Sequence, residues 1–512
     1  MKYFKYSSLF VAVLFFNVAF GQQKPIGIFN YNKDIGKPKN AGSARFDEAT
    51  QAYHLKGAGY NIWFERDEFN YLYNKMGGDF IITAHVEFIG KGTDPHRKIG
   101  LMLRESEDEK AASISATLHG DGLTVMQWRA LRGAYMRDPE DEIFTPKSNY
   151  NILQLERSGT DIIMRAAHTG EPLQLIGTHK MESLKDSVLA GLFISSHNQD
   201  VVEEARAWNV RIDHPVADNY NTGREGWLGC RLETMNVFNG ERKVIYEKDG
   251  RFEAPNWMPD GKRLLFNMDG SLFTIAVEGG EPVKLNTGEV NRNNNDHGIS
   301  FNGKLLAISS SRESGGGSSV FVMPLEGGTP KLITEETPSY WHGWAPTNKE
   351  VVYVATREGN PTYDIYRKSI DGGKEVALTN TGPGQHVDGC EYSPDGKYIY
   401  YNGSQSGTMQ IWRMKPDGTS PEQLSFDEYN NWFPHISPDG KWIAYISFPP
   451  DIPVNSHPSY KRVTLKLMPV SGGSPRVIAY LYGGQGTINV PSWSPDSKSI
   501  AFVSNSGRKK AR

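Results

Sequence analysis

The sequence predicts an all-β protein of two domains, an N-terminal β-sandwich of the jelly-roll type followed by a six-bladed β-propeller. Three observations carry this prediction. A turn motif recurs six times in the second half, short alternating strands fill the first half, and the 512 residues include 53 glycines and 29 prolines. Many short strands separated by turns rich in Gly and Pro are typical of sandwiches and closed β architectures rather than of helical proteins.

The composition excludes several classes of function. Lys and Arg number 56 against 59 Asp and Glu, a net charge of −3, which gives no basic surface for nucleic acid. Two cysteines are too few for a disulfide scaffold or a multi-thiolate metal cluster. The sequence also lacks the Gly-x-Ser-x-Gly, P-loop, His-Glu-x-x-His and Cys-x-x-Cys motifs of esterases, nucleotide hydrolases, zincins and thiol-redox proteins.

Residues 1–21 have the form of a secretory signal peptide. Lys2 and Lys5 precede an apolar run at 9–20, and Gly21 supplies a small residue before the predicted cleavage. The run is short for a bilayer span, although an uncleaved anchor helix is the alternative. No later apolar stretch approaches 18 residues. We therefore expect an exported protein, periplasmic or secreted, with no transmembrane segment after this leader.

Residues 27–213 are predicted to form the sandwich. Alternating apolar residues and Gly-containing turns define strands at 79–89, 99–104, 123–129, 151–157, 161–165, 188–195 and 205–212. The segments Gly-Leu-Met-Leu-Arg (100–104), Leu-Gln-Leu-Glu-Arg (153–157) and Trp-Asn-Val-Arg-Ile (208–212) resemble the concanavalin/laminin-G-like jelly-roll domains of secreted bacterial carbohydrate-active proteins. That resemblance implies a carbohydrate-binding fold. Residues 214–230, rich in Asn, Asp, Gly and Pro, are the predicted linker.

Residues 231–508 contain the repeat. Variants of a Trp/Tyr/Ile-Ser-Pro-Asp-Gly-Lys turn have their proline position at 259, 301, 346, 394, 438 and 495, so the period is 42 to 57 residues. Each turn is followed by an apolar strand, a polar gap, a second strand and a Gly-Gly or Asp-Gly hairpin. Four short strands per repeat of 40–50 residues is the pattern of a propeller blade.

The two ends of the repeat region predict how the propeller closes. The sixth copy stops after two strands near residue 505, and a strand, Asn-Gly turn and strand at 232–246 precede the first copy. A blade shared by both ends would leave no open sheet edge.

The repeated Ser-Pro-Asp-Gly-Lys turns resemble the TolB-type six-bladed propellers built from PD40-type repeats. TolB-type proteins carry an α/β domain ahead of the propeller, where this chain has the predicted sandwich. The resemblance implies a periplasmic protein-interaction scaffold with envelope proteins as partners.

Chemistry is predicted at the mouth of the propeller axis. Alignment of the six turns places His297, His342 and His435 at one position on three blades, with Glu391 in the same ring. Imidazoles beside a carboxylate suit proton transfer or one divalent metal held by the three histidines. Hydrogen bonding between blades around a water-filled channel is the alternative.

Four further residues of this ring are candidate ligand contacts: Asn256, Trp341, Trp344 and Trp432. The indole rings suit stacking on sugars. Oligogalacturonate lyases also resemble TolB-like propellers and hold a metal with axial histidines, a pattern that His297, His342 and His435 match by position only.

The sequence therefore leaves three hypotheses for function. The leading one is an exported protein that recognises an oligo- or polysaccharide through its sandwich and binds or processes a ligand at the propeller axis. The second is a polysaccharide lyase or glycosidase that uses His297, His342, Glu391 and His435 as catalytic residues with a metal. The third is the TolB-like scaffold.

Weaker candidates lie in the sandwich. Asp94, His96 and Arg97, with Asp121 after His119, are candidates for a glycan or Ca²⁺ site, and loop polarity is the alternative. Trp63 with Asp67 and Glu68 is a candidate sugar platform, and a core tryptophan is the alternative. His197-Asn198 is predicted to be a turn, and Cys230 and Cys390 are not expected to pair.

Overall fold

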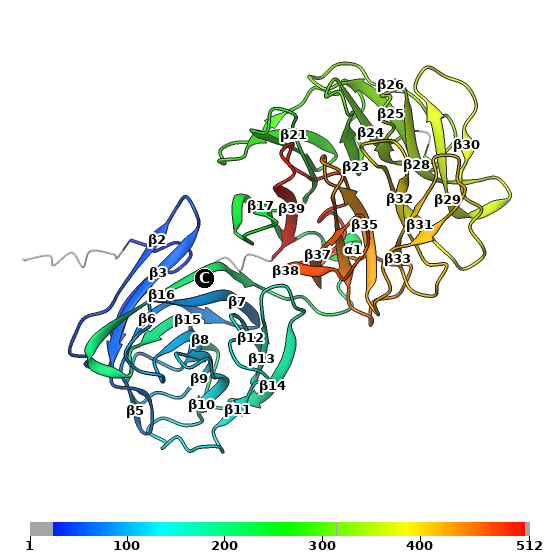
Figure 1. The fold of residues 1–512 in the computed structure, drawn as a ribbon. Helices are drawn as coiled ribbons and strands as arrows, with labels where there is room; N and C mark the ends of the chain where they lie inside the picture. Colours follow the sequence, from blue (N-terminus) through cyan, green and yellow to red (C-terminus); the bar gives the residue numbers. More distant parts are fainter. Residues whose placement is uncertain (1–23, 314, 507–512) are drawn as a thin grey trace, which may run out of the picture.

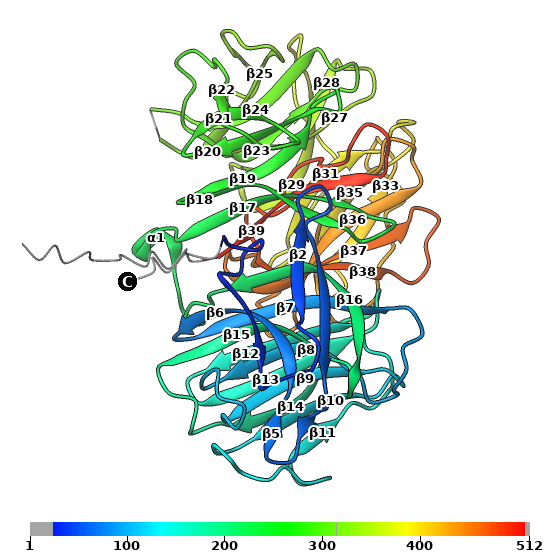
Figure 2. The same cartoon turned by 90° about the vertical axis from the view of Figure 1, so that its left-hand side faces the viewer.

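A computed structural model describes residues 24–313 and 315–506. The predicted signal peptide at 1–21 lies outside these residues. The N-terminal sheets and the propeller form two bodies that meet along one side, with β7 and β16 on one side of the junction and β38 and β39 on the other (Figures 1 and 2). No helix of the described residues is long and apolar enough to cross a membrane.

The N-terminal half consists mainly of two antiparallel seven-stranded sheets. The first sheet has the order β1 (Tyr31–Ile35), β6 (Phe69–Gly77), β15 (Ser187–Ser195), β8 (Lys98–Arg104), β9 (Ser113–His119), β10 (Thr124–Arg129) and β11 (Glu142–Phe144). The second has the order β14 (Gln174–Lys180), β13 (Asp161–Ala167), β12 (Ile152–Ser158), β7 (Phe80–Ile89), β16 (Asn198–Asp213), β3 (Ala52–Gly59) and β2 (Ser43–Asp47). A short hairpin, β4 (Ile62–Trp63) and β5 (Arg66–Asp67), lies outside both.

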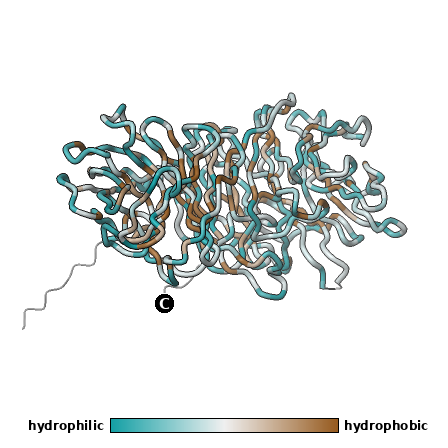
Figure 3. The backbone as a smooth tube through the Cα atoms, turned by 90° about the horizontal axis from the view of Figure 1, so that it is seen from below, coloured by the Kyte–Doolittle hydropathy of each residue, from teal (hydrophilic) through white to brown (hydrophobic). Residues whose placement is uncertain are grey.

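One apolar core lies between these sheets. Leu101 and Leu103 of β8 and Leu153 and Leu155 of β12 belong to the same cluster of fully buried side chains. Their spacing of two residues follows from the pleat, because alternate side chains of a strand point to the same face. Figure 3 shows that, along the described residues, hydrophobic stretches gather in the interior and hydrophilic ones in the outer loops.

Each of the seven strands predicted for this half is confirmed, within two residues at most boundaries, although β16 begins earlier, at Asn198. Strands β3, β6, β9 and β14 were not among the predicted ones. The concanavalin/laminin-G relationship stays a prediction.

The C-terminal half is a six-bladed propeller. Five blades are four-stranded sheets built from consecutive strands: β19 (Phe252–Trp257), β20 (Arg263–Met268), β21 (Ser271–Ala276) and β22 (Val283–Lys284); β23 (Asn293–Ile299), β24 (Leu305–Ser311), β25 (Ser318–Pro324) and β26 (Lys331–Leu332); β27 (Ser339–Trp344), β28 (Glu350–Arg357), β29 (Asn360–Ser369) and β30 (Val376–Ala377); β31 (Val387–Tyr392), β32 (Ile399–Gly403), β33 (Gln410–Met414) and β34 (Glu422–Gln423); β35 (Asn430–Ile436), β36 (Trp442–Phe448), β37 (Lys461–Pro469) and β38 (Arg476–Gly483).

The remaining blade joins both ends of the domain, as the split repeat predicts. Strand β39 (Ser499–Asn505) pairs with β17 (Gly229–Asn236), which pairs in turn with β18 (Arg242–Asp249). The short helix α1 (Thr222–Glu225) lies in the predicted linker just before β17. Because this blade needs chain from both ends, the propeller closes on itself and leaves no gap between its first and last repeats.

The recurrent turn is built by its own side chains. In the copy at 437–441, Ser437 Oγ donates to Asp439 Oδ1, and the backbone N–H of Lys441 donates to the same carboxylate. Gly440 follows with φ of 70°, a conformation that favours glycine. The motif therefore has a local reason to recur between the first two strands of a blade.

A buried ion-pair network joins the two domains. Glu233 on β17 is fully buried, and its carboxylate accepts from Arg211 of β16 at 2.7 Å and from Arg242 of β18 at 2.8 Å. Ser504 of β39 donates a third hydrogen bond to it at 2.6 Å. Although burial opposes its ionisation, the two guanidinium groups lower the pKa of Glu233 to about 2. The network ties the long strand β16 directly to the blade that closes the propeller.

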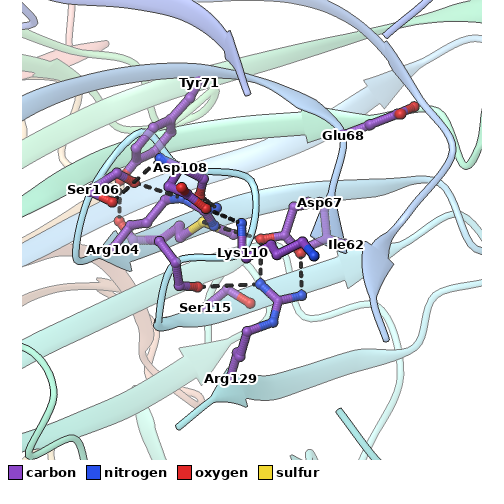
Figure 4. A network of polar contacts seen from close by, with 12 residues as sticks. Ile62, Asp67, Glu68, Tyr71, Arg104, Ser106, Asp108, Lys110, Ser115 and Arg129 are labelled. Atoms are coloured by element: carbon purple, nitrogen blue, oxygen red, sulfur yellow. Dashed lines mark hydrogen bonds and ion pairs between the residues drawn. The ribbon is translucent and has the colours of Figure 1, made fainter. Parts of the chain in front are cut away.

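A second buried network lies within the N-terminal domain (Figure 4). Asp67 at the end of β5 accepts from Arg104 of β8 at 2.7 Å and from Arg129 of β10 at 2.6 Å, and all three side chains are fully buried. This network anchors the β4–β5 hairpin onto the first sheet. The prediction of Asp67 and Glu68 as part of a sugar platform is therefore wrong for these residues, since the Glu68 side chain is also buried and binds Arg66.

Candidate functional site

The inner strands of the propeller surround a cavity of about 350 Å³. Three histidines and two aspartates line it: His342 on β27, His386 just before β31, His457 after β36, Asp296 on β23 and Asp388 on β31. Tyr340 and Tyr363 add hydroxyl groups, and their ring centroids are 6.1 Å apart. Four blades thus contribute polar side chains to a single cavity.

Asp388 is the centre of this site. Its Oδ1 lies 2.7 Å from Nε2 of His342, and its Oδ2 lies 3.7 Å from Nε2 of His386 and 4.0 Å from Nε2 of His457. Although burial opposes its ionisation, the neighbouring imidazoles hold the pKa of Asp388 well below its usual range. Asp388 is therefore a fixed negative charge that holds the ring of His342 and lies close to those of His386 and His457.

His342 is the most strongly held of the three rings. Burial alone would lower its pKa, but the adjacent carboxylate of Asp388 and the more distant one of Asp296 raise it above the ordinary value. Its Nδ1 is buried and has no hydrogen-bond partner among the described residues. A ring held through one nitrogen, with the other unpaired at a cavity, is suited to donating a hydrogen bond or a proton to a ligand.

Asp296 differs from Asp388 in its ionisation. It receives a single side-chain hydrogen bond, from Nδ2 of Asn294 at 2.9 Å. Burial raises the pKa of Asp296 to about 7, and the charge of Asp388 adds to the effect. The pKa values of the two carboxyl groups in this cavity therefore differ widely. Asp296 can act as an acid near neutral pH, whereas Asp388 stays ionised.

Two of the three predicted ring histidines lie outside this cavity lining. His297 is fully buried, and burial lowers its pKa to about 3. His435 uses both ring nitrogens, Nδ1 with Glu391 Oε2 at 2.7 Å and Nε2 with the carbonyl of Ile488 at 2.8 Å. Glu391 also accepts from the N–H of Ile436. His435 and Glu391 thus form a buried contact between neighbouring blades, as the alternative expectation held.

No three His, Cys, Asp or Glu side chains within 24–313 and 315–506 are arranged to hold a metal ion. The three-histidine ligand set predicted from the sequence does not converge in this structure. Metal binding at the axis stays a prediction, and no set of three ligating side chains among the described residues supports it.

The predicted aromatic platforms are not open to a ligand. Trp341 and Trp432 are fully buried, and Trp344 is buried with its indole N–H bonded to the carbonyl of Gly298. Trp432 lies behind the site, with its ring 4.4 Å from that of His457 and 5.5 Å from that of His386. Asn256 is buried as well and donates to the carbonyl of Pro491. These four buried side chains pack within the propeller blades and are not exposed to a ligand.

Alignment of the six turns missed Asp296 and Asp388 because of bulges in the inner strands, and it missed His386 and His457 because they lie in loops outside those strands. Each inner strand has a register shift before its turn, for example between Asp388 and Glu391 in β31 and between Trp432 and His435 in β35. At three of the shifts one residue has a φ of 55–60°: Ala254, Gly389 and Phe433. A β-bulge re-aims the following side chains, so regular alternation identifies the wrong residues as axial.

The fold and site define a six-bladed β-propeller protein with a histidine- and aspartate-lined axial cavity. Residues 342–456 match the family described as PD40, the TolB beta propeller domain. An uncharacterized protein of Agrobacterium fabrum is 43% identical over 284 residues, which are 55% of this chain and 94% of that protein. The chain therefore belongs to the TolB-like β-propeller family.

A solved structure and a Tol-Pal protein extend the comparison. The structure of a putative TolB from Agrobacterium tumefaciens is 43% identical, covers 55% of this chain and 99% of that chain, and has a TM-score of 0.51. The Tol-Pal system protein TolB of Francisella tularensis is 25% identical over 388 residues, 72% of this chain and 80% of that protein.

Proposed function

We propose that this protein is an exported envelope protein that binds a partner protein at the axial cavity of its TolB-like propeller. The cavity lined by His342, Asp388 and Asp296 carries the proposal. A volume of about 350 Å³ is at the lower end for ligand sites and fits one or two side chains of a partner better than a long polymer. A single inserted anchor is how many interfaces concentrate their binding energy.

Two further observations support this proposal over saccharide binding. The relatives include a Tol-Pal system protein. The indole rings expected to stack on sugars are buried in the blade walls. The saccharide-binding, lyase and glycosidase hypotheses are the competitors that the experiment must separate from partner binding.

Site-specific photo-cross-linking in the cells that produce the protein tests the proposal. A photoreactive phenylalanine replaces half-buried Tyr363 at the cavity, and in a matched control it replaces exposed Val376 on the outer strand of the same blade. We expect a discrete protein adduct from position 363 only, and its loss when Asp388→Asn is added.

Equal adducts at both positions, or none at 363, would contradict the proposal. Purified protein is also incubated with uronate-containing oligosaccharides, with and without divalent metal, and assayed for new reducing ends or double bonds. Cleavage that depends on His342 would replace partner binding with the enzymatic hypothesis.

A further inference from the structure

A second cluster of imidazoles lies in the N-terminal domain, at one end of the first sheet and away from the propeller cavity. Lys98 on β8 and His119 on β9 are directly opposite each other across the two strands, so their side chains are on the same face. The His96 ring lies 6.0 Å from that of His119 and 5.4 Å from that of His197. The side chains come from three separate stretches of the chain.

Lys98 is a buried cation without an ion pair. Only 4% of the residue is exposed, and its Nζ donates to Oδ1 of Asn61 at 2.9 Å and to the carbonyl of His96 at 3.2 Å. Among the described residues no carboxylate lies within ion-pair distance of this ammonium group. Burial lowers the pKa of Lys98 to about 8. A buried charge without a counter-charge is costly, so such a group is usually paired.

His119 has unused hydrogen-bonding capacity at the same place. It is 4% exposed, and neither ring nitrogen makes a hydrogen bond within the described residues, although Gln127 is close to it. Even if Gln127 turned to one nitrogen, the other would have no partner. Buried polar atoms of this kind call for an explanation such as an absent ligand.

The nearby carboxylates do not contact Lys98 directly, although the charge of Asp94 acts on the ammonium group and opposes the fall of its pKa. Asp94 lies 3.2 Å from Nδ1 of His197, and buried Arg97 binds Glu203 at 2.6 Å, so neither carboxylate is available to Lys98. Residue His197 has a φ of 57°, an uncommon backbone conformation for a residue other than glycine. His96 is exposed and marks the solvent side of the cluster.

We propose that Lys98, His119 and His96 bind an oxyanion group, a carboxylate or a phosphate, carried by a ligand of the N-terminal domain. An oxyanion accepts from the free N–H of the ammonium and from the imidazoles, and it supplies a counter-charge in direct contact with Lys98, which Asp94 does not. This site is independent of the function proposed for the propeller. The glycan or Ca²⁺ site predicted around Asp94 and Asp121 stays a prediction.

Thermal unfolding of the full chain tests the site. Unfolding is followed in sodium acetate, sodium phosphate and sodium chloride at equal ionic strength and pH 7. We expect acetate, phosphate or both to raise the midpoint above that in chloride, because an anion that binds only the folded state stabilises it. The comparison of acetate with phosphate identifies the oxyanion.

Four variants locate the effect. Lys98→Met should weaken the apparent affinity about tenfold or more, since it removes a hydrogen bond to a charged group, and exposed Lys91→Met is the matched control that should keep it. His96→Ala, on the solvent side, should also weaken the affinity and guards against a folding defect in Lys98→Met. Equal midpoints in the three salts, or an anion effect that survives Lys98→Met, would overturn the proposal. An effect lost only in His342→Ala would assign the anion to the propeller instead.

Discussion

Nε2 of His342 lies 2.7 Å from Oδ1 of Asp388, and the two side chains come from neighbouring blades, on β27 and β31. Both side chains line the cavity, and the contact places the imidazole of His342 directly beside a permanently ionised carboxylate. The carboxylate fixes the ring through Nε2, which leaves Nδ1 for a ligand. This division of roles between the two nitrogens is how a buried histidine is set up for proton transfer or directed hydrogen bonding.

Asp388→Asn should lower the pKa of His342, because the variant removes the charge that holds it above its ordinary value. Exchange of the histidine C2 proton with solvent, followed by mass spectrometry across pH, reports this pKa for one peptide at a time. Asp395→Asn, in an exposed turn, is the control and should leave it unchanged. An unaltered exchange profile in Asp388→Asn would show that Asp388 does not set the charge of His342.

The two groups also predict when their contact stabilises the fold. The pKa of Asp388 is depressed in the folded protein, so its contribution is present above the unfolded value of about 3.9 and is lost as the pH falls through the folded pKa. The pKa of His342 is raised, so its contribution is complete below about 6.5 and is lost as the pH rises through the folded pKa. We expect Asp388→Asn to lower the thermal midpoint most between pH 4 and 6.5, as measured by circular dichroism, and progressively less above that range.

Asp296→Asn should have the opposite dependence on pH. The pKa of Asp296 is about 7 in the folded protein, so between about 3.9 and 7 the folded state holds a proton that the unfolded state has lost. The free energy of unfolding of the wild-type protein therefore falls as the pH rises through this range. Asparagine does not titrate, so the variant should gain stability relative to wild type from pH 5 to pH 8.

Urea unfolding at both pH values measures this gain. Exposed Asp371→Asn is the matched control. A difference between Asp296→Asn and wild type that is the same at pH 5 and pH 8 would contradict the assignment.

The repeat explains how much of this architecture the sequence could predict. The recurrent turn is a local structure, held in one copy by the contact of Ser437 with Asp439, and so its six variants predict six blades. The pairing of β17 with β39 follows from the same count, since half a blade is missing at each end. Regular strands such as β8 and β12 were predictable because their alternation reflects one shared core.

The site was less predictable because it depends on bulges and on long-range contacts. His342 was identified from the sequence. Asp388 was not, because the register of its strand shifts between Asp388 and Glu391, and regular alternation along the strand does not predict which side chains face the axis. His386 and His457 come from loops whose path is set by tertiary packing, and no repeat position marks them. Trp341 and Trp432 are large enough to fill the blade walls, and sequence alone does not distinguish a buried indole from an exposed one.

Glu233→Gln should weaken the coupling between the two domains. The variant leaves Arg211 and Arg242 buried without their shared counter-charge, and removal of one partner of a buried pair costs about 3–5 kcal/mol. We expect calorimetry to show a lower midpoint and a separation of the propeller and N-terminal transitions. The control is Glu241→Gln, which breaks the more exposed pair with Arg206 at the same junction and should cost about 1 kcal/mol or less. Equal effects of the two substitutions would mean that burial of Glu233 is not what joins the domains.

Asp67→Asn should destabilise the N-terminal domain by a similar mechanism, without direct effect on the junction. The substitution removes the carboxylate that Arg104 and Arg129 share, so two fully buried guanidinium groups lose their counter-charge. A loss of about 3–5 kcal/mol is expected in the N-terminal transition, because a buried cation left unpaired is far costlier than an exposed one. Asp161→Asn, which breaks a half-exposed contact with Lys180, is the matched control and should change the transition by less than about 1 kcal/mol. Hydrogen exchange then identifies the segment that opens: faster exchange in residues 60–68 supports the role of Asp67 as the anchor of the β4–β5 hairpin, and unchanged exchange there would contradict it.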